Sequence, residues 1–227
     1  RTLGENLGYL NCSGYYDRCD EELAARSLTW QEIIRPYKKA IGTDGAIAIL
    51  KGNLAPEGAV IKHTACPKEM FRAVLRARPF DSEEECLDAV LHHKGQKGDA
   101  VFIRYEGPRA AGMPEMFYTS EAISSDKELG RAIALITDGR FSGASTGPVI
   151  GHVSPEAYEG GNLALIQNGD MVHIDIAARS LTVDVSDEEF ERRKQGWKPV
   201  VKPASGWLRL YRKECTSAHR GATVYWD

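Results

Sequence analysis

The sequence has 227 residues, of which 42% are hydrophobic and 27% are charged, and its formal net charge at pH 7 is −3. These values are typical of a soluble protein with one well-packed domain and at most a short extension. They exclude a nucleic-acid partner, which would need clustered lysine and arginine. They also exclude a membrane span, because no apolar run approaches the roughly 18 residues that cross a bilayer.

The cysteines favour a cytoplasmic protein with reduced thiols. Their number is odd and they form no Cys-x-x-Cys pair, so a disulfide or zinc framework is not expected. Cys12 and Cys19 stay open as ligands of a metal that takes a third group. The sequence begins at Arg1 without an initiating methionine or an apolar signal segment. We therefore interpret the chain as a fragment or an excised domain.

The first residues differ in pattern from the rest of the chain. Residues 1–35 show little periodicity and are expected to be an arm that connects to a missing N-terminal domain. Residues 36–227 are expected to form one C-terminal domain. Within it, the apolar runs 46–50 and 59–61 predict two short strands, with a turn at Gly52-Asn53.

Three helices are predicted. Ser82 precedes Glu85 with the spacing of a capping box, which predicts a helix that runs to about His93. Residues 186–189 form a second capping box. The stretch 207–217 is the third helix candidate.

Two irregular loops each follow an apolar strand. Residues 101–103 predict a strand that leads into the loop 106–116, where two prolines and two glycines argue against regular structure. Residues 132–136 predict a strand covered on both faces, because the run does not alternate. It leads into the glycine-rich loop 138–147. Loops on a rigid scaffold are the usual place for chemistry.

The remaining pattern decides the fold class. Residues 163–166 predict a strand, and Asn168-Gly169-Asp170 predicts a turn before the paired strands 171–176 and 180–185. Strands and helices do not alternate cleanly, so a doubly wound parallel sheet is not favoured. We predict a mixed α and β fold, a compact barrel or layered sheet with helices outside.

The loop 138–147 has the composition of a ligand-binding loop. Its glycines permit a close approach of backbone to ligand, and successive N–H groups can bind an anion. Arg140 can pair with a carboxylate. The hydroxyls are those of Ser142, Ser145 and Thr146. The alternative is a tight structural turn in which Arg140 pairs with Asp138 or with another carboxylate.

Residues 143–147 match Gly-x-Ser-x-Gly, the nucleophile elbow of α/β-hydrolases. That motif places the serine on the turn directly after a strand, whereas Ser145 stands well beyond Ile136. Pro148 also follows, where the elbow would continue into a helix. Serine hydrolysis is therefore an outside alternative, and a Walker loop is excluded by the missing Gly-Lys-Ser/Thr.

Several ordered motifs resemble one family, the dihydroxy-acid and phosphogluconate dehydratases. The motifs are Gly-Asn-Leu-Ala-Pro-Glu-Gly-Ala-Val at 52–60, Ile-Arg-Tyr-Glu-Gly-Pro at 103–108, Gly-Met-Pro-Glu-Met at 112–116, Ala-Leu-Ile-Thr-Asp-Gly-Arg-Phe-Ser-Gly at 134–143, Ile-Gly-His-Val-Ser-Pro-Glu-Ala at 150–157 and Gly-Gly-Asn at 160–162. The resemblance covers residues 30–220 and concerns the C-terminal domain of these enzymes.

The resemblance implies a hydro-lyase that converts a 2,3-dihydroxy carboxylic acid or a sugar acid into a 2-keto or 2-keto-3-deoxy acid. It implies an iron–sulfur cluster, [2Fe-2S] or [4Fe-4S], and a nearby Mg²⁺, with the cluster cysteines and most Mg²⁺ ligands in a missing N-terminal domain. It implies a swivelling, β-barrel-like C-terminal domain with peripheral helices in β/β/α layers. This domain would supply Ser142 as the base and Glu115 as a Mg²⁺ ligand, and the isolated chain would be inactive.

Three further residues of the loop are candidates for substrate binding or for loop structure, namely Arg140, Gly143 and Ser145. His152 is interpreted as structural. The full-length protein is expected to be a homodimer or homotetramer whose partners are its own N-terminal domain and a hydroxy-acid substrate. Branched-chain amino-acid biosynthesis and sugar-acid catabolism are not separated. The rival from another class is a non-catalytic module that binds an organic anion.

Overall fold

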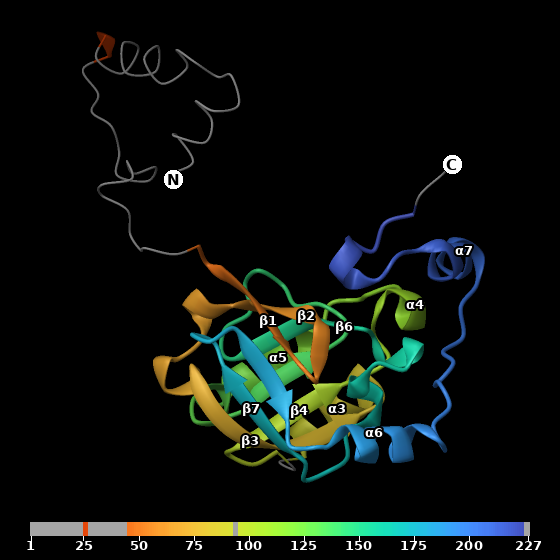
Figure 1. Ribbon diagram of the computed structural model, residues 1–227. Helices are drawn as coiled ribbons and strands as arrows, with labels where there is room; N and C mark the ends of the chain where they lie inside the picture. The colour runs from red at the N-terminus through yellow and green to blue at the C-terminus, as the bar shows by residue number, and fades with distance from the viewer. Residues whose placement is uncertain (1–24, 27–44, 93–94, 225–227) are drawn as a thin grey trace. The chain divides into compact units, whose positions relative to one another are not determined.

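The computed structural model describes residues 25–26, 45–92 and 95–224 (Figure 1). The chain divides into two compact units, Arg1–Gly45 and Ala46–Asp227, and the described strands belong to the second. The connecting arm predicted for residues 1–35 lies outside the described residues, apart from Ala25 and Arg26.

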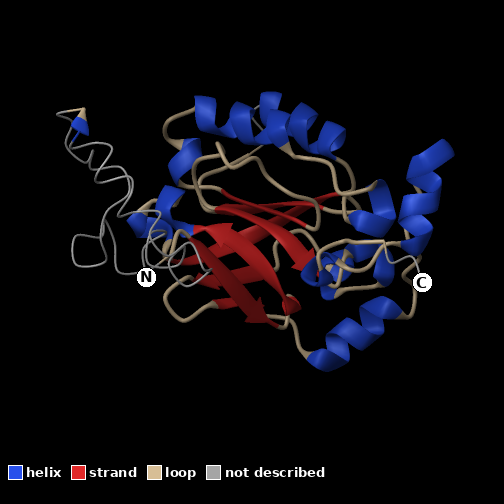
Figure 2. Ribbon diagram, turned by 90° about the horizontal axis from the view of Figure 1, so that it is seen from above, coloured by secondary structure: helices blue, strands red, loops and turns tan. Residues whose placement is uncertain are grey.

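The second unit is a closed barrel with helices around it, which confirms the predicted mixed barrel fold (Figure 2). The strands are β1 (Ile47–Gly52), β2 (Ala55–Lys62), β3 (Arg72–Phe80), β4 (Asp99–Ile103), β5 (Ala134–Thr137), β6 (Val149–Ser154), β7 (Met171–Asp175) and β8 (Ser180–Val183). The α-helices are α3 (Glu83–Leu91), α4 (Pro108–Ala111), α5 (Phe117–Ser125), α6 (Asp187–Lys194) and α7 (Gly206–Glu214). Short 3-10 turns lie at His63–Ala65, Lys68–Met70, Leu129–Arg131, Ala157–Glu159, Asn162–Leu165 and Ala218–Arg220.

The strand order around the barrel is β1-β2-β6-β5-β4-β3-β7-β8. The segment β3-β4-β5-β6 is parallel throughout, whereas β1-β2, β2-β6, β3-β7 and β7-β8 are antiparallel pairs. Because β4, β5 and β6 run in one direction, the chain leaves all three at the same end of the barrel. The loops that follow β4 and β5 therefore begin side by side.

The central strands are buried on both faces. In β4, Ala100 and Phe102 point into the barrel core, while Val101 and Ile103 join a second cluster that also contains Cys86 of α3 and Ile123 of α5. This alternation of two apolar environments explains why β4 and β5 show no polar side in the sequence.

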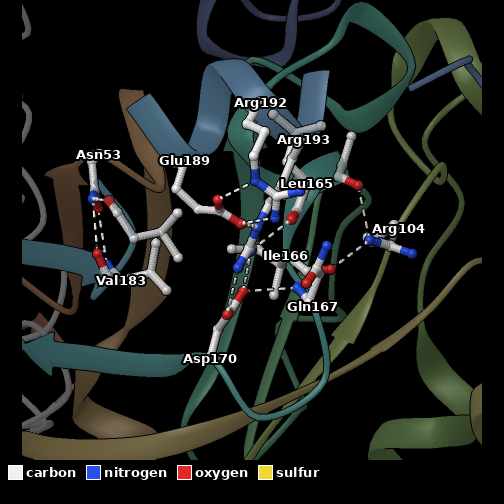
Figure 3. Close-up of polar contacts among 12 residues, drawn as sticks. Asn53, Arg104, Leu165, Ile166, Gln167, Asp170, Val183, Glu189, Arg192 and Arg193 are labelled. Atoms are coloured by element: carbon white, nitrogen blue, oxygen red, sulfur yellow. Dashed lines mark hydrogen bonds and ion pairs between the residues drawn. The ribbon is translucent and has the colours of Figure 1, made fainter. Parts of the chain in front are cut away.

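An asparagine side chain completes the barrel where β1 meets β8. The two strands pair in parallel at Lys51 and Ser180. Just beyond, the Asn53 amide donates to the carbonyl of Val183 and accepts the Val183 N–H, both at 2.9 Å (Figure 3). Its carboxamide thus makes the two bonds that a further strand residue would make.

An ion-pair network fixes α6 on the barrel (Figure 3). The Arg193 guanidinium lies 2.6 Å from the carboxylate of Asp170 and 2.7 Å from that of Glu189, and it also donates to the Leu165 carbonyl at 3.0 Å. Only 10% of the Arg193 side chain is exposed, so this network is largely shielded from water.

The capping predictions are confirmed. The Ser82 hydroxyl accepts the N–H of Glu85 at 3.1 Å, and that of Ser186 accepts the N–H of Glu189 at 3.2 Å. The predicted hairpin is formed by β7 and β8, and the third helix appears as α7. None of the helices in the described segments is long and apolar enough to cross a bilayer.

Other local predictions are wrong. Residues 163–166 form a 3-10 turn rather than a strand, and the loop 106–116 contains the single-turn helix α4. The strand β3 and the helix α5 were not predicted.

Candidate functional site

The two loops singled out in the sequence begin at neighbouring strand ends. Strands β4 and β5 pair in parallel up to Ile103 and Thr137, so residues 104–116 and 138–147 leave the same edge of the barrel. The second loop must then cross back, because β6 starts beside Leu135 and is parallel to β5. It passes over β6, where a Cβ on Gly151 would lie 3.4 Å from the Gly139 carbonyl oxygen.

Asp138 ties these loops together from inside. Its carboxylate is fully buried and accepts the backbone N–H groups of Tyr105 at 3.2 Å, Glu106 at 2.9 Å and Ala157 at 2.8 Å. Burial raises the pKa of Asp138 to about 6, although the N–H donors have the opposite effect and lower the pKa. The alternative in which Asp138 pairs with Arg140 is wrong, since the carboxylate is used to bind backbone N–H groups.

A backbone junction joins the two loops at Glu115 and Arg140. The Arg140 N–H donates to the Pro114 carbonyl at 3.3 Å, and the Met116 N–H donates to the Arg140 carbonyl at 2.9 Å. Residue 115 therefore faces residue 140 as in a one-pair parallel sheet. The sequence prediction that both belong to one site is compatible with this contact, which no local pattern indicated.

The side chains at this junction are available to a ligand. Glu115 and Arg140 are both exposed, and neither makes a side-chain hydrogen bond or ion pair within the described residues. Arg140 carries its positive charge close to His152, whose pKa is lowered first by burial and then by that charge. A carboxylate and a guanidinium that have no side-chain partner among the described residues thus lie on adjoining loops.

Ser142 follows two residues after the junction. It is half-buried, its hydroxyl oxygen accepts the N–H of Ala144 at 3.2 Å, and its carbonyl accepts the N–H of Ser145 at 3.1 Å. The neighbouring Gly143 is exposed. The Ser142 hydroxyl proton is therefore free to engage a ligand while an N–H group holds the oxygen.

Ser145 does not stand on a nucleophile elbow. Its side chain is only 4% exposed, and its hydroxyl oxygen has no hydrogen-bond partner in the described part of the chain. No helix follows it, because the chain enters β6 at Val149. A serine hydrolase needs the nucleophile exposed and bonded to a base, so this geometry argues against that alternative.

Two further residues of this region were missed by the sequence analysis. Glu156 is 2% exposed and accepts the N–H groups of Arg109 at 2.8 Å and Ala110 at 3.0 Å, which anchors α4. Burial raises the pKa of Glu156 to about 7. Lys62, at the end of β2, donates to the Gly143 carbonyl. Neither contact has a signal in the sequence, since each joins segments far apart along the chain.

The donor groups fit one of the two implied metal cofactors. Glu115 is exposed and supplies a hard carboxylate oxygen of the kind that Mg²⁺ prefers. Cys66, Cys86 and Cys215 are buried free thiols whose pKa is raised mainly by burial, to about 12 for Cys66, so they fit poorly as thiolate ligands. Within residues 45–92 and 95–224, no three His, Cys, Asp or Glu side chains gather as a metal cage. Cys12 and Cys19 lie outside the described residues.

The fold and the site define a class of protein, a closed-barrel domain whose polar, ligand-accessible groups lie on loops that begin at the carboxyl ends of parallel strands. The family model described as dihydroxy-acid/6-phosphogluconate dehydratase C-terminal matches residues 32–222, and the chain belongs to this family.

Curated relatives carry the name dihydroxy-acid dehydratase. The protein of Methanococcoides burtonii is 45% identical over 223 residues, which cover 98% of this chain and 38% of the relative. Those of Clostridium kluyveri and Archaeoglobus fulgidus are each 50% identical, over 86% and 87% of this chain and 35% and 36% of their own lengths. The chain thus spans little more than a third of the relatives that it matches.

Proposed function

We propose that this chain is the C-terminal portion of a hydro-lyase that removes water from a 2,3-dihydroxy carboxylic acid and yields a 2-keto acid. The observation that carries the proposal is the junction of the two loops, which brings Glu115 and Arg140 together with Ser142 two residues further on. The relatives' name supports a dihydroxy acid over a sugar acid as substrate.

Ser142 acts as the base in this proposal. Ser142 reacts as an alkoxide: the C2–H bond breaks, its proton passes to the Ser142 oxygen, and the electron pair forms the C2=C3 bond as hydroxide leaves from C3. The hydroxyl so formed on Ser142 returns its proton to that hydroxide, which departs as water and restores the alkoxide. The resulting enol becomes the 2-keto acid. A serine oxygen must first be an alkoxide to accept a proton, and the Ala144 N–H that points at it stabilises negative charge there.

Glu115 contributes a carboxylate to Mg²⁺, with the remaining ligands and the cluster cysteines on the N-terminal domain. The bound cluster would supply the Lewis acid that draws off the C3 hydroxyl. Glu115→Gln in the longer protein should weaken Mg²⁺ binding at least tenfold, because the amide lacks the negative charge. Isothermal titration with Mg²⁺ measures this, and an unchanged affinity would remove Glu115 from the site.

Arg140 binds the substrate carboxylate. Backbone atoms of residue 140, not its guanidinium, hold the two loops together, so the side chain is left for a ligand. A guanidinium matches a carboxylate in a two-point contact. Arg140→Lys should therefore raise KM more than it lowers kcat.

The remaining parts of the proposal concern the whole protein. The domain, taken from residue 36 onward, swivels to close over the substrate, the peripheral helices forming the outer layer. Ser145 and Gly143 shape the loop. The full-length protein is a cytoplasmic homodimer or homotetramer.

The experiment compares the 227-residue chain with a longer protein that also carries the cluster-binding portion. Both are assayed with 2,3-dihydroxyisovalerate, a simple 2,3-dihydroxy acid, by detection of the 2-keto product. The longer protein should turn over and the chain alone should not. Turnover by the chain alone would overturn the proposal, and binding without turnover by the cluster-loaded longer protein would favour the rival anion-binding module.

A further inference from the structure

The segment after β2 contacts the crossing loop at two points. Lys62, the last residue of β2, donates from its ammonium group to the Gly143 carbonyl. Three residues on, the Ala65 carbonyl accepts the N–H of Gly147 at 3.0 Å. Strand β2 is antiparallel to β6, so its end lies where β6 begins and where the loop arrives.

Between its two backbone anchors the loop packs Phe141 against the second apolar cluster but makes few hydrogen bonds to the rest of the chain. Arg140 is fixed to Met116, and Gly147 is fixed to Ala65. Residues 141–146 lie between these anchors. Within the described structure, the bond from Lys62 is the one hydrogen bond that joins them to a residue outside the loop. The other bonds join Ser142 to Ala144 and Ser145.

We infer that Lys62 is a positioning residue for Ser142, an inference that rests on the proposed role of Ser142 as the base. The ammonium group bonds to the carbonyl of the Gly143–Ala144 peptide, and the N–H of the same peptide donates to the Ser142 hydroxyl oxygen. Fixing this peptide therefore fixes the direction of the Ser142 hydroxyl. An ammonium group can make this contact with three donors, and a charged donor makes a stronger bond than a neutral one. A small misplacement of a catalytic group is enough to cost about 10²-fold in rate.

The first test needs no turnover. In the 227-residue chain, Lys62→Met should accelerate amide hydrogen exchange in a peptide covering 141–147 by about tenfold, the effect of losing about one hydrogen bond. Lys62→Arg keeps a charged donor and should leave exchange within about threefold of the wild type. Lys68→Met is the matched control, since Lys68 is exposed and lies outside the loop contacts. Unchanged exchange in Lys62→Met would overturn the inference whatever the chemistry.

The second test uses the longer, cluster-loaded protein. Lys62→Met should lower kcat by about 10²-fold while KM stays within about threefold, because the substrate contacts remain. Lys62→Arg should recover most of kcat, Lys68→Met should equal the wild type, and cluster absorbance should match in all three. A normal kcat in Lys62→Met, together with an inactive Ser142→Ala, overturns the role of Lys62 alone. An active Ser142→Ala overturns the proposed base and this inference with it.

Discussion

Two glycines in the loop 138–147 should respond to alanine in opposite directions. Gly147 has φ +94°, and a Cβ there would lie 2.9 Å from the Gly130 carbonyl oxygen. At Gly143 a Cβ would meet nothing within 4 Å, and φ lies outside the left-handed region. Alanine is therefore strained at position 147 and has space and an allowed backbone conformation at position 143.

The magnitudes follow from these surroundings. A left-handed backbone costs alanine about 1–2 kcal/mol, and displacing the Gly130 carbonyl adds about 1–3 kcal/mol. The lower entropy of the unfolded alanine chain returns about 0.4–1 kcal/mol. Gly147→Ala should thus lower the free energy of unfolding by about 1–5 kcal/mol, whereas Gly143→Ala should raise it by about 0.4–1 kcal/mol.

Urea unfolding of the 227-residue chain, followed by circular dichroism, measures both changes. Slopes against urea concentration equal to that of the wild type would show that the variants differ from it in stability and not in the surface exposed on unfolding. Gly143→Ala as destabilised as Gly147→Ala, or Gly147→Ala with the wild-type midpoint, would refute the reasoning.

Two further changes test the scaffold of the site. Asn53→Asp replaces the amide that donates to the Val183 carbonyl at 2.9 Å with a carboxylate oxygen. This change should lower the free energy of unfolding in urea by about 2–4 kcal/mol. Asn168→Asp, at an exposed position, is the control, and equal effects of the two changes would contradict the barrel-closing role of Asn53. Burial raises the pKa of Glu156 from 4.5 to about 7, so the folded state keeps this proton longer than the unfolded chain. The free energy of unfolding of the wild type should therefore fall relative to that of Glu156→Gln as pH rises between these values, and a pH-independent difference would refute this account.

Local signals in the sequence predicted the parts of the fold that depend on local physics. The capping boxes at Ser82 and Ser186 place both helix starts correctly because the cap bonds span only three residues. The unbroken apolar run in β5 correctly indicates a strand covered on both faces. Each of these signals is complete within a few residues.

Elements that depend on distant partners were mispredicted. Residues 163–166 have the composition of a strand, yet the carbonyls of Ala164 and Ile166 accept hydrogen bonds from the Arg104 guanidinium, both at 3.0 Å (Figure 3). Those bonds take the place of a neighbouring strand. The strand β3 was missed because its exposed arginines interrupt the apolar pattern, and Arg78 is paired with the buried Asp99 at 3.0 Å.

In the candidate site, too, local features could be predicted from the sequence and contacts between distant segments could not. Glycine and hydroxyl content predicted a ligand-binding loop at 138–147, and the resemblance assigned roles to Ser142 and Glu115, which stay predictions. Asp138 could have paired with Arg140 or with backbone N–H groups. Only the structure decides between the two, because it places the N–H groups of Tyr105 and Ala157 against the Asp138 carboxylate. The Lys62 contact spans 81 residues of sequence and has no local signature.

The rate of a single turnover tests whether Ser142 is the base. The longer protein with Ser142→Ala, loaded with cluster to the same absorbance as the wild type, is mixed with a limiting amount of 2,3-dihydroxy acid, and formation of the 2-keto acid is followed through a single turnover. Loss of a general base predicts a rate lower by about 10²–10⁴-fold, with Ser125→Ala on the outer helix α5 at the wild-type rate. A Ser142→Ala rate within about threefold of the wild type, well short of the loss expected for a general base, would contradict the claim.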